Sequence, residues 1–180
     1  MRIIAGTLRG RRLRAPAGRI VRPTGDRMKA SMFSALGDTC RKARVLDLYA
    51  GSGALGFEAL SRGAVQATFV ENNRLSLEAL RENAHTLQVV DSSRIIEAEV
   101  FYFLGTLGEN IDFDLIFADP PFQKLLAQKL LSWWQANSRE GSVFVLEYPS
   151  AFLPSAAPAD IQPVKTAAFG ESAYSIYLAR

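Results

Sequence analysis

Apolar residues along this chain fall into short runs that alternate with segments of helical spacing. Four apolar runs follow residue 43, namely "RVLDLYAG", "ATFVEN", "RIIEAE" and "FDLIFADPP". Each run predicts a buried strand, and each is followed by a segment that predicts an amphipathic helix, near 54–62, 74–84, 100–107 and 124–136. A fifth run, "GSVFVLEYP", predicts another strand. Strands alternating with helices indicate a doubly wound, mostly parallel sheet covered on both faces.

The two ends of the chain have different patterns. Residues 1–22 carry small apolar groups between arginines and glycines, which predicts a basic N-terminal β-hairpin. Within 23–40 apolar residues recur at helical spacing, which predicts a linking helix with Thr24 as a possible N-cap. The tail alternates with period two and predicts an antiparallel C-terminal hairpin that completes a seven-stranded sheet. We expect a single domain over 1–180, with its catalytic core in 41–180.

A glycine loop follows the first strand of the core. "DLYAGSGALG" places Gly51, Gly53 and Gly56 in the order G-x-G-x-x-G between a strand and a helix start, where backbone N–H groups can approach a ligand. Glu71 ends the next strand about twenty residues later, a spacing that suits a carboxylate bonded to ribose hydroxyls. Together these features predict a ligand that contains adenosine.

Two further acids favour one such ligand over another. Asp47 lies inside the first core strand and Glu99 is expected to end the third. Anions near the loop would repel the pyrophosphate of a dinucleotide, whereas the amine and sulfonium of S-adenosylmethionine (AdoMet) would be tolerated. Glu99 could accept the adenine amine, and Asp47 could hold an ammonium group or orient the loop. The alternative that both acids only cap the turns after them stays open.

"ADPPF" ends the fourth core strand, beside the first strand, at the point where ligands bind in open parallel sheets. Prolines keep Asp119 and Pro120 extended, and neither Pro120 nor Pro121 offers an N–H group. The Asp119 carboxylate and Pro120 carbonyl can then accept both hydrogens of a planar exocyclic amine, with Phe122 stacked on its ring. This arrangement suits methylation of an unstacked nucleobase.

Charge divides the chain unevenly. Up to residue 44 there are twelve Lys and Arg against two Asp, which leaves nine basic and sixteen acidic residues of the totals of 21 and 18. A basic end on an acidic body suits a polyanion such as RNA, although a solvated basic surface is the alternative. One Cys and one His cannot form a Cys/His metal cage, so we expect no metal site. No apolar stretch has the length of a membrane span, and we expect a cytoplasmic protein without a membrane partner.

With these residues identified, the chain resembles the bacterial 16S rRNA guanine-N2 methyltransferases of the RsmD type. The motifs are "RIIAGTLRGRRL", "RPTGDRMKASMF", "DLYAGSGALGFEALSRGA", "DPPF" and "GESAYSIY". The resemblance implies a class I AdoMet-dependent methyltransferase fold, AdoMet as methyl donor, and 16S rRNA of the assembled or assembling small ribosomal subunit as partner. A monomer is the simpler expectation. The sequence departs from the family pattern at Ala30, Ser34, Glu99 and the "ENN" after the second core strand.

The residues and the resemblance together assign three groups of side chains. Catalysis is assigned to Asp119, Pro120, Pro121 and Phe122. Cofactor binding is assigned to Thr24, Asp47, Tyr49, Ala50, Gly51, Ser52, Gly53, Glu71, Asn72, Glu99, Val100 and Asp119. RNA binding is assigned to Arg9, Arg11, Arg12, Arg22 and Arg27.

Three other functions remain open at this point. A DNA adenine-N6 methyltransferase would use the same "DPPF" motif, although the chain has no sizeable extra domain for reading duplex sequence. An NAD-dependent oxidoreductase would bind nicotinamide and take up no methyl groups. An RNA-binding assembly factor without catalysis would not need Asp119.

Overall fold

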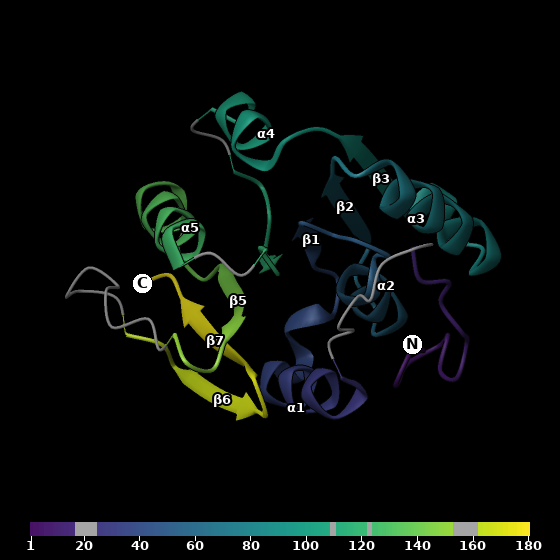
Figure 1. The fold of residues 1–180 in the computed structure, drawn as a ribbon, viewed down its shortest axis with the longest axis horizontal. Coiled ribbons are helices and arrows are strands. Elements are labelled where there is room, and N and C mark those ends of the chain that lie inside the picture. The colour runs from purple at the N-terminus through teal and green to yellow at the C-terminus, as the bar shows by residue number, and fades with distance from the viewer. Residues whose placement is uncertain (17–24, 109–110, 122–123, 153–161) are drawn as a thin grey trace.

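The structure is a computed structural model that describes residues 1–16, 25–108, 111–121, 124–152 and 162–180. Within these ranges seven strands form one sheet, in the spatial order β3-β2-β1-β4-β5-β7-β6 (Figure 1). Pairing is parallel from β3 to β5, and β7 runs antiparallel to β5 and β6. The predicted sheet and its antiparallel C-terminal pair are confirmed. The strands are β1 Arg44–Leu48, β2 Gln66–Glu71, β3 Ser93–Glu97, β4 Leu115–Ala118, β5 Val143–Pro149, β6 Lys165–Phe169 and β7 Ser172–Leu178.

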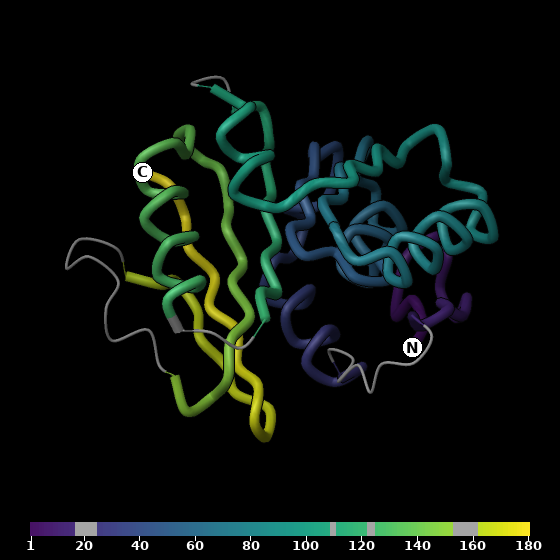
Figure 2. Tube along the Cα trace, turned by 45° about the horizontal axis from the view of Figure 1, so that its top comes forward, coloured from purple at the N-terminus to yellow at the C-terminus, as the bar shows by residue number. Residues whose placement is uncertain are grey.

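Helices cover both faces of this sheet. Apolar residues of α1, α2 and α3 pack with one face, and those of α4 and α5 pack with the other (Figure 2). The central strands are buried on both faces, which explains their continuous apolar runs. The helices of the described ranges are α1 Asp26–Leu36, α2 Ala54–Ser61, α3 Arg74–Thr86, α4 Val100–Thr106 and α5 Lys124–Asn137, with 3₁₀ turns η1 Gly37–Cys40 and η2 Val90–Ser92.

The strand order sets the place of the site. β1 has β2 on one side and β4 on the other, so the order reverses between β1 and β4. Helices that follow neighbouring strands on opposite sides of this point leave a crevice beyond the carboxyl ends of β1 and β4. The glycine loop follows β1 and Asp119 follows β4, so the expected switch point is confirmed.

The N-terminal hairpin is shorter than predicted. Residues 1–16, called the N-terminal arm below, contain one antiparallel bridge, Arg2 to Arg12, rather than two regular strands. The reason lies in the backbone donors, because the N–H groups of Ile4 and Ala5 bond to the carboxylate of Glu58 in α2 at 2.7 and 3.0 Å. These donors are used for docking against the core and cannot extend a ladder. The remainder of the predicted hairpin, 17–22, lies outside the described residues.

The predicted linking helix divides into α1 and the 3₁₀ turn after it. Met28, Met32, Phe33 and Leu36 are buried, as their spacing predicted. The N-cap position of α1 is Gly25, which makes no side-chain capping bond, and the expected cap Thr24 lies outside the described residues. Burial of the apolar face therefore holds this helix more than capping does.

Candidate active site

The glycine loop joins β1 to α2 with three residues in the left-handed region. Tyr49, Gly51 and Gly53 have φ of 57°, 56° and 81°. A Cβ at Gly53 would lie 2.4 Å from Phe57 Cε2, so this position requires glycine for packing as well as conformation. A Cβ at Gly51 would meet only the Tyr49 carbonyl, at 4.0 Å. The loop thus turns tightly at Gly53 and leaves open space at Gly51 for a close ligand.

Asp47 orients this loop from inside β1. Its Oδ2 atom accepts a hydrogen bond from Gly56 N at 2.9 Å, and its side chain is 2% exposed. Burial raises the pKa of Asp47 to about 8; the Gly56 bond opposes that rise, and the charges of Asp119 and Glu71 add to it. Of the two roles considered for Asp47, the structure shows the orienting one. A Cβ at Gly56 would lie 2.3 Å from Phe69, so the third glycine permits close contact between helix and strand.

Glu71 links the end of β2 to the glycine loop. Its Oε2 atom accepts a hydrogen bond from Gly51 N at 2.8 Å. Its Oε1 atom accepts from Asn72 N and Asn73 N at 2.9 and 2.8 Å. Three backbone N–H groups therefore fix the carboxylate beside Gly51. The side chains of Ala50 and Ser52 belong to the same loop, where Ala50 is half-buried and Ser52 is buried.

Glu99 is not where the sequence placed it. β3 ends at Glu97, and Glu99 is the N-cap of α4, whose carboxylate accepts from Tyr102 N at 2.8 Å. The strand stops two residues early, and an acidic cap then satisfies a free N–H group at the helix start. Glu99 remains exposed at this edge of the sheet, so one carboxylate oxygen can serve the helix while the other faces outward. Val100 is buried in the core by its side chain and offers only its backbone.

Asp119 follows β4 at the switch point. Its N–H group donates to the Leu48 carbonyl at 3.4 Å, which holds the residue against the end of β1. The side chain is half-buried, Pro120 is buried and Pro121 is exposed. Burial raises the pKa of the Asp119 carboxyl. Phe122 lies outside the described residues, as does Arg22 among the predicted RNA-binding residues.

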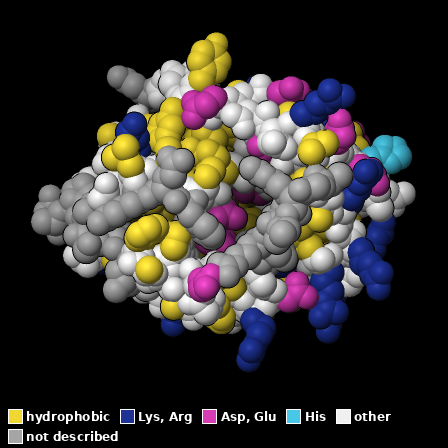
Figure 3. Space-filling model, in the orientation of Figure 1, with side chains coloured by type: hydrophobic (Ala, Val, Ile, Leu, Met, Phe, Trp, Pro, Cys, Tyr) yellow, Lys and Arg dark blue, Asp and Glu magenta, His cyan; other side chains and the backbone are white. Residues whose placement is uncertain are grey.

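The acids and the arginines occupy different parts of one face. Figure 3 shows acidic side chains inside a central hollow and Lys and Arg side chains along one edge. Arg9, Arg11 and Arg12 are exposed on the arm, and Arg11 donates to the Thr86 carbonyl. Arg27 is exposed at the start of α1, where it lines a pocket of about 650 Å³ with the turn between β6 and β7. The basic edge and the acidic hollow thus lie on the same face of the molecule.

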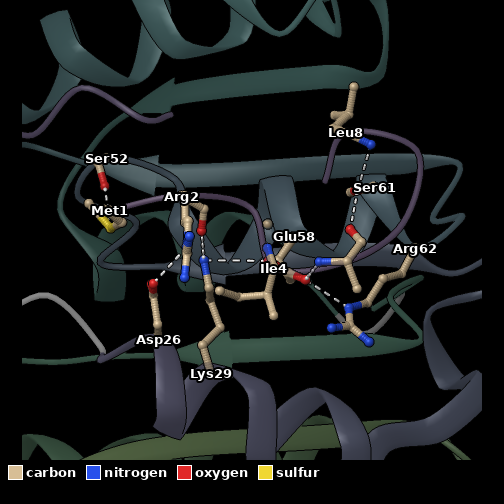
Figure 4. Close-up of polar contacts among 12 residues, drawn as sticks. Met1, Arg2, Ile4, Leu8, Asp26, Lys29, Ser52, Glu58, Ser61 and Arg62 are labelled. Carbon is tan, nitrogen blue, oxygen red and sulfur yellow. Dashed lines mark hydrogen bonds and ion pairs between the residues drawn. The ribbon is translucent and has the colours of Figure 1, made fainter. Parts of the chain in front are cut away.

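Sequence reasoning missed the residues that hold the arm in place. Glu58 of α2 and Lys29 of α1 are both fully buried, and Asn83 of α3 is 2% exposed (Figure 4 shows the first two). Glu58 lies inside the otherwise apolar run "ALGFEAL", and an acid that interrupts such a run could have signalled a buried partner. Asn83 gave no such signal.

Two absences apply to the described ranges. No group of three or more His, Cys, Asp or Glu side chains there could hold a metal ion. No helix within them is both long and apolar enough to cross a membrane.

The pKa of Asp47 predicts how stability depends on pH. In the unfolded chain this carboxyl has an ordinary pKa near 3.8. Between pH 3.8 and about 8, Asp47 is therefore protonated in the folded state and ionised in the unfolded state. The stabilisation is complete below the lower value and is lost progressively as pH rises to the upper one, on the order of 5 kcal/mol in total. We expect Asp47→Asn to flatten the fall in unfolding free energy between pH 5 and 8, measured by urea denaturation. Asp91→Asn, at an exposed position, is the control, and equal slopes in wild type and Asp47→Asn would contradict the prediction.

Comparison with known proteins places the chain in a family. The family model described as conserved hypothetical protein 95 matches residues 1–178. The chain belongs to this family. It is the RsmD family, so the resemblance seen in the motifs is confirmed. Ribosomal RNA small subunit methyltransferase D of Escherichia coli is 34% identical over 180 residues, which cover 98% of this chain and 89% of that protein.

Two solved structures support the fold. One, described as a putative methyltransferase from Escherichia coli, has a TM-score of 0.87 and 32% identity, covering 100% of this chain and 98% of that one. The other is an RNA methyltransferase from Salinibacter ruber in complex with S-adenosyl-L-homocysteine, with a TM-score of 0.67 and 15% identity, covering 88% and 94%. The fold of this family member is therefore the class I methyltransferase fold, as predicted.

Proposed function

We propose that this protein is an AdoMet-dependent methyltransferase that modifies the exocyclic N2 amine of one guanine in 16S rRNA. The observation that carries the proposal is the position of Asp119 beside the glycine loop, at the end of β4 where it meets β1. An acceptor for a base amine and a loop for a nucleoside cofactor therefore open into one crevice. Relatives in the family are named as methyltransferases of small-subunit ribosomal RNA.

The residues present fit AdoMet. Gly51 has open space in front of it, and Glu71 offers a fixed carboxylate for the two ribose hydroxyls. Glu99 and the Val100 backbone lie at the start of α4, just after the end of β3, where they would hold the adenine. The Asp119 carboxyl beside the loop and the fixed Glu71 carboxylate disfavour a pyrophosphate and suit a cationic ligand. Tyr49, Ala50, Ser52, Gly53 and Asn72 complete the proposed cofactor site, and Thr24 would lie over it.

Bound AdoMet supplies an electrophilic methyl group on a sulfonium. The protein holds the acceptor, because the Asp119 carboxylate and the Pro120 carbonyl accept the two N–H groups of the guanine amine. Two fixed acceptors favour a pyramidal nitrogen, stabilise its developing positive charge and orient its lone pair toward the methyl group. Pro121 stiffens the loop, and Phe122 is proposed to stack on the guanine ring. The nitrogen loses one proton as the new bond forms, and the raised pKa of Asp119 suits its carboxylate as acceptor.

The arm is proposed to bind the RNA backbone, together with Arg22 and Arg27. Arg9, Arg11 and Arg12 are exposed on it, and cations near the cleft can neutralise phosphates and release counterions. The partner would be the 16S rRNA of an assembled or assembling small subunit, met by a cytoplasmic, monomeric enzyme.

Replacing Arg9, Arg11 and Arg12 together by Ala should weaken affinity for 16S rRNA and reduce its dependence on salt. Three lost phosphate contacts predict a slope of log affinity against log salt that is shallower by about two to three. Filter binding across a series of salt concentrations measures this slope. Arg74→Ala, on the exposed surface of α3 where it pairs with Glu78, is the control. An unchanged slope in the triple variant would remove the arm from the RNA interface.

The test of the function is methyl transfer to its proposed substrate. Small ribosomal subunits from cells lacking this activity are incubated with the protein and radiolabelled AdoMet, and the nucleosides of their 16S rRNA are analysed. We expect label in N2-methylguanosine at one site. Label in DNA adenine instead would favour the adenine-N6 alternative, and label in neither would overturn the proposal.

A further inference from the structure

The buried carboxylate of Glu58 is used for docking the N-terminal arm. Each of its oxygens accepts a hydrogen bond from one backbone N–H group of the arm and lies near one cationic side chain (Figure 4). Oε2 accepts from Ile4 N at 2.7 Å and lies 3.4 Å from Lys29 Nζ. Oε1 accepts from Ala5 N at 3.0 Å and from Arg62 Nε at 2.9 Å. The Glu58 carboxylate is 0% exposed, but two backbone N–H groups and two cations replace the water it loses on burial.

Lys29 ties the arm to α1 as well. Its Nζ atom donates to the Arg2 carbonyl at 2.5 Å, and its side chain is fully buried. A buried ion pair is often no more stabilising than apolar residues of the same size, so stability alone gives no reason for one here. What the pair supplies is an acceptor and a donor placed for backbone groups of the arm.

The next turn of α2 fixes the bend of the arm. Ser61 Oγ accepts from Leu8 N at 2.9 Å and donates to the Ala5 carbonyl at 2.5 Å. Gly6 lies against the helix with φ of 85°, and a Cβ there would be 1.8 Å from the Ser61 carbonyl oxygen. The bend thus docks backbone to backbone, with no room for a side chain.

Asn83 joins the far end of the arm to the glycine loop. Asn83 of α3 accepts from Arg14 N at 2.7 Å and donates to the Arg14 carbonyl at 3.0 Å. The same amide nitrogen donates to the Ser52 carbonyl at 3.0 Å. The arm is therefore held at both ends, and one of its holding residues also contacts the loop proposed to bind AdoMet.

We propose that Glu58 is a positioning residue for RNA, which acts by holding the arm as a preformed surface that presents Arg9, Arg11 and Arg12 beside the cleft. The proposal rests on the proposed function. A surface that is already ordered loses less conformational entropy when it binds, so the anchor should improve RNA affinity without touching the methyl donor.

Two variants and one control test this role. Glu58→Gln leaves an amide NH₂ facing backbone donors and removes the counter-charge of Lys29. Gly6→Ala keeps every charge and only prevents the bend from docking, so it remains informative if Glu58→Gln unfolds. Glu78→Gln makes the same chemical change in an exposed pair with Arg74. Amide exchange of residues 1–13, AdoMet affinity, and KM and kcat for small subunits are measured for each.

We expect faster exchange over residues 1–13 in Glu58→Gln and Gly6→Ala, and a rise in KM for subunits of about tenfold. The value of kcat should stay as in wild type, and AdoMet affinity should change much less than KM, because Asn83 still holds the Ser52 carbonyl. All values for Glu78→Gln should stay as in wild type. Unchanged exchange in both arm variants would overturn the anchoring role. Faster exchange with an unchanged KM would overturn the link to RNA while leaving the methyltransferase proposal intact.

A wild-type protein that transfers no label would instead refute the proposed function. In that case, titration of a fluorescent 16S rRNA fragment still tests the role of the arm, because it measures RNA affinity without methyl transfer. Weaker binding by Gly6→Ala than by wild type would support the positioning role, and equal affinities would overturn it.

Discussion

Asp119→Ala should lower kcat for methyl transfer by about 100- to 1,000-fold, because it removes an acceptor that acts on charge developing in the transition state. AdoMet affinity should stay largely in place, since Glu71 and Asp47 hold the loop through Gly51 N and Gly56 N, and neither of these bonds involves Asp119. Single-turnover methylation of small subunits and calorimetric titration with AdoMet measure the two quantities separately.

Two further variants sharpen this prediction. Asp119→Asn keeps one oxygen acceptor but cannot take a proton, so a rate between those of wild type and Asp119→Ala would indicate hydrogen bonding as the main role. A rate as low as that of Asp119→Ala would show that the negative charge of Asp119, or its acceptance of a proton, contributes more to the rate than hydrogen bonding does. Asp112→Ala is the matched control, because Asp112 precedes the same strand at its opposite end and pairs with Arg44. Equal loss of methyl transfer and AdoMet binding in Asp119→Ala would contradict the amine-holding role.

The sheet could be predicted because its signals are local. Apolar runs of strand length alternate with helical spacing, and each pattern depends on residues a few positions apart. The glycine loop was equally readable, since its glycine spacing lies within one strand–turn–helix segment, although the contacts that require Gly53 and Gly56 also involve Leu80 of α3 and Phe69 of β2. The fold and the position of Asp119 at the switch point follow from that regularity.

The docking of the arm could not be predicted in the same way. The predicted hairpin forms only one antiparallel bridge. The N–H groups of Ile4 and Ala5 instead donate to the carboxylate of Glu58, more than fifty positions away. Only the folded core brings Glu58 to these donors, and a tertiary contact then overrides local strand pairing. The position of Glu99 is a second feature that the sequence did not predict. β3 ends two residues before it, so Glu99 caps α4 and does not end the strand.

Glu71→Ala should weaken AdoMet binding by about 100-fold, the second large effect. The carboxylate accepts three backbone N–H groups, one of them from Gly51, and is proposed to accept the ribose hydroxyls. Hydrogen bonds to a charged acceptor are each worth about 1.5 to 3 kcal/mol, so losing the acceptor for the ligand while loosening the loop supports this magnitude. Calorimetric titration with AdoMet measures the change. The AdoMet affinity of Glu71→Gln should fall between those of wild type and Glu71→Ala.

Glu97→Ala is the matched control for this variant. Glu97 is the register partner of Glu71 on β3, but it is exposed and pairs with Arg81 at 2.9 Å, so its loss should leave AdoMet affinity unchanged. At saturating AdoMet, Glu71→Ala should recover most of its kcat, because the groups proposed to hold the guanine amine remain in place. Recovery of kcat in Glu71→Ala, set against its loss in Asp119→Ala, would separate the cofactor half of the crevice from the amine half. An AdoMet affinity like that of wild type in Glu71→Ala would show that the ribose is held elsewhere.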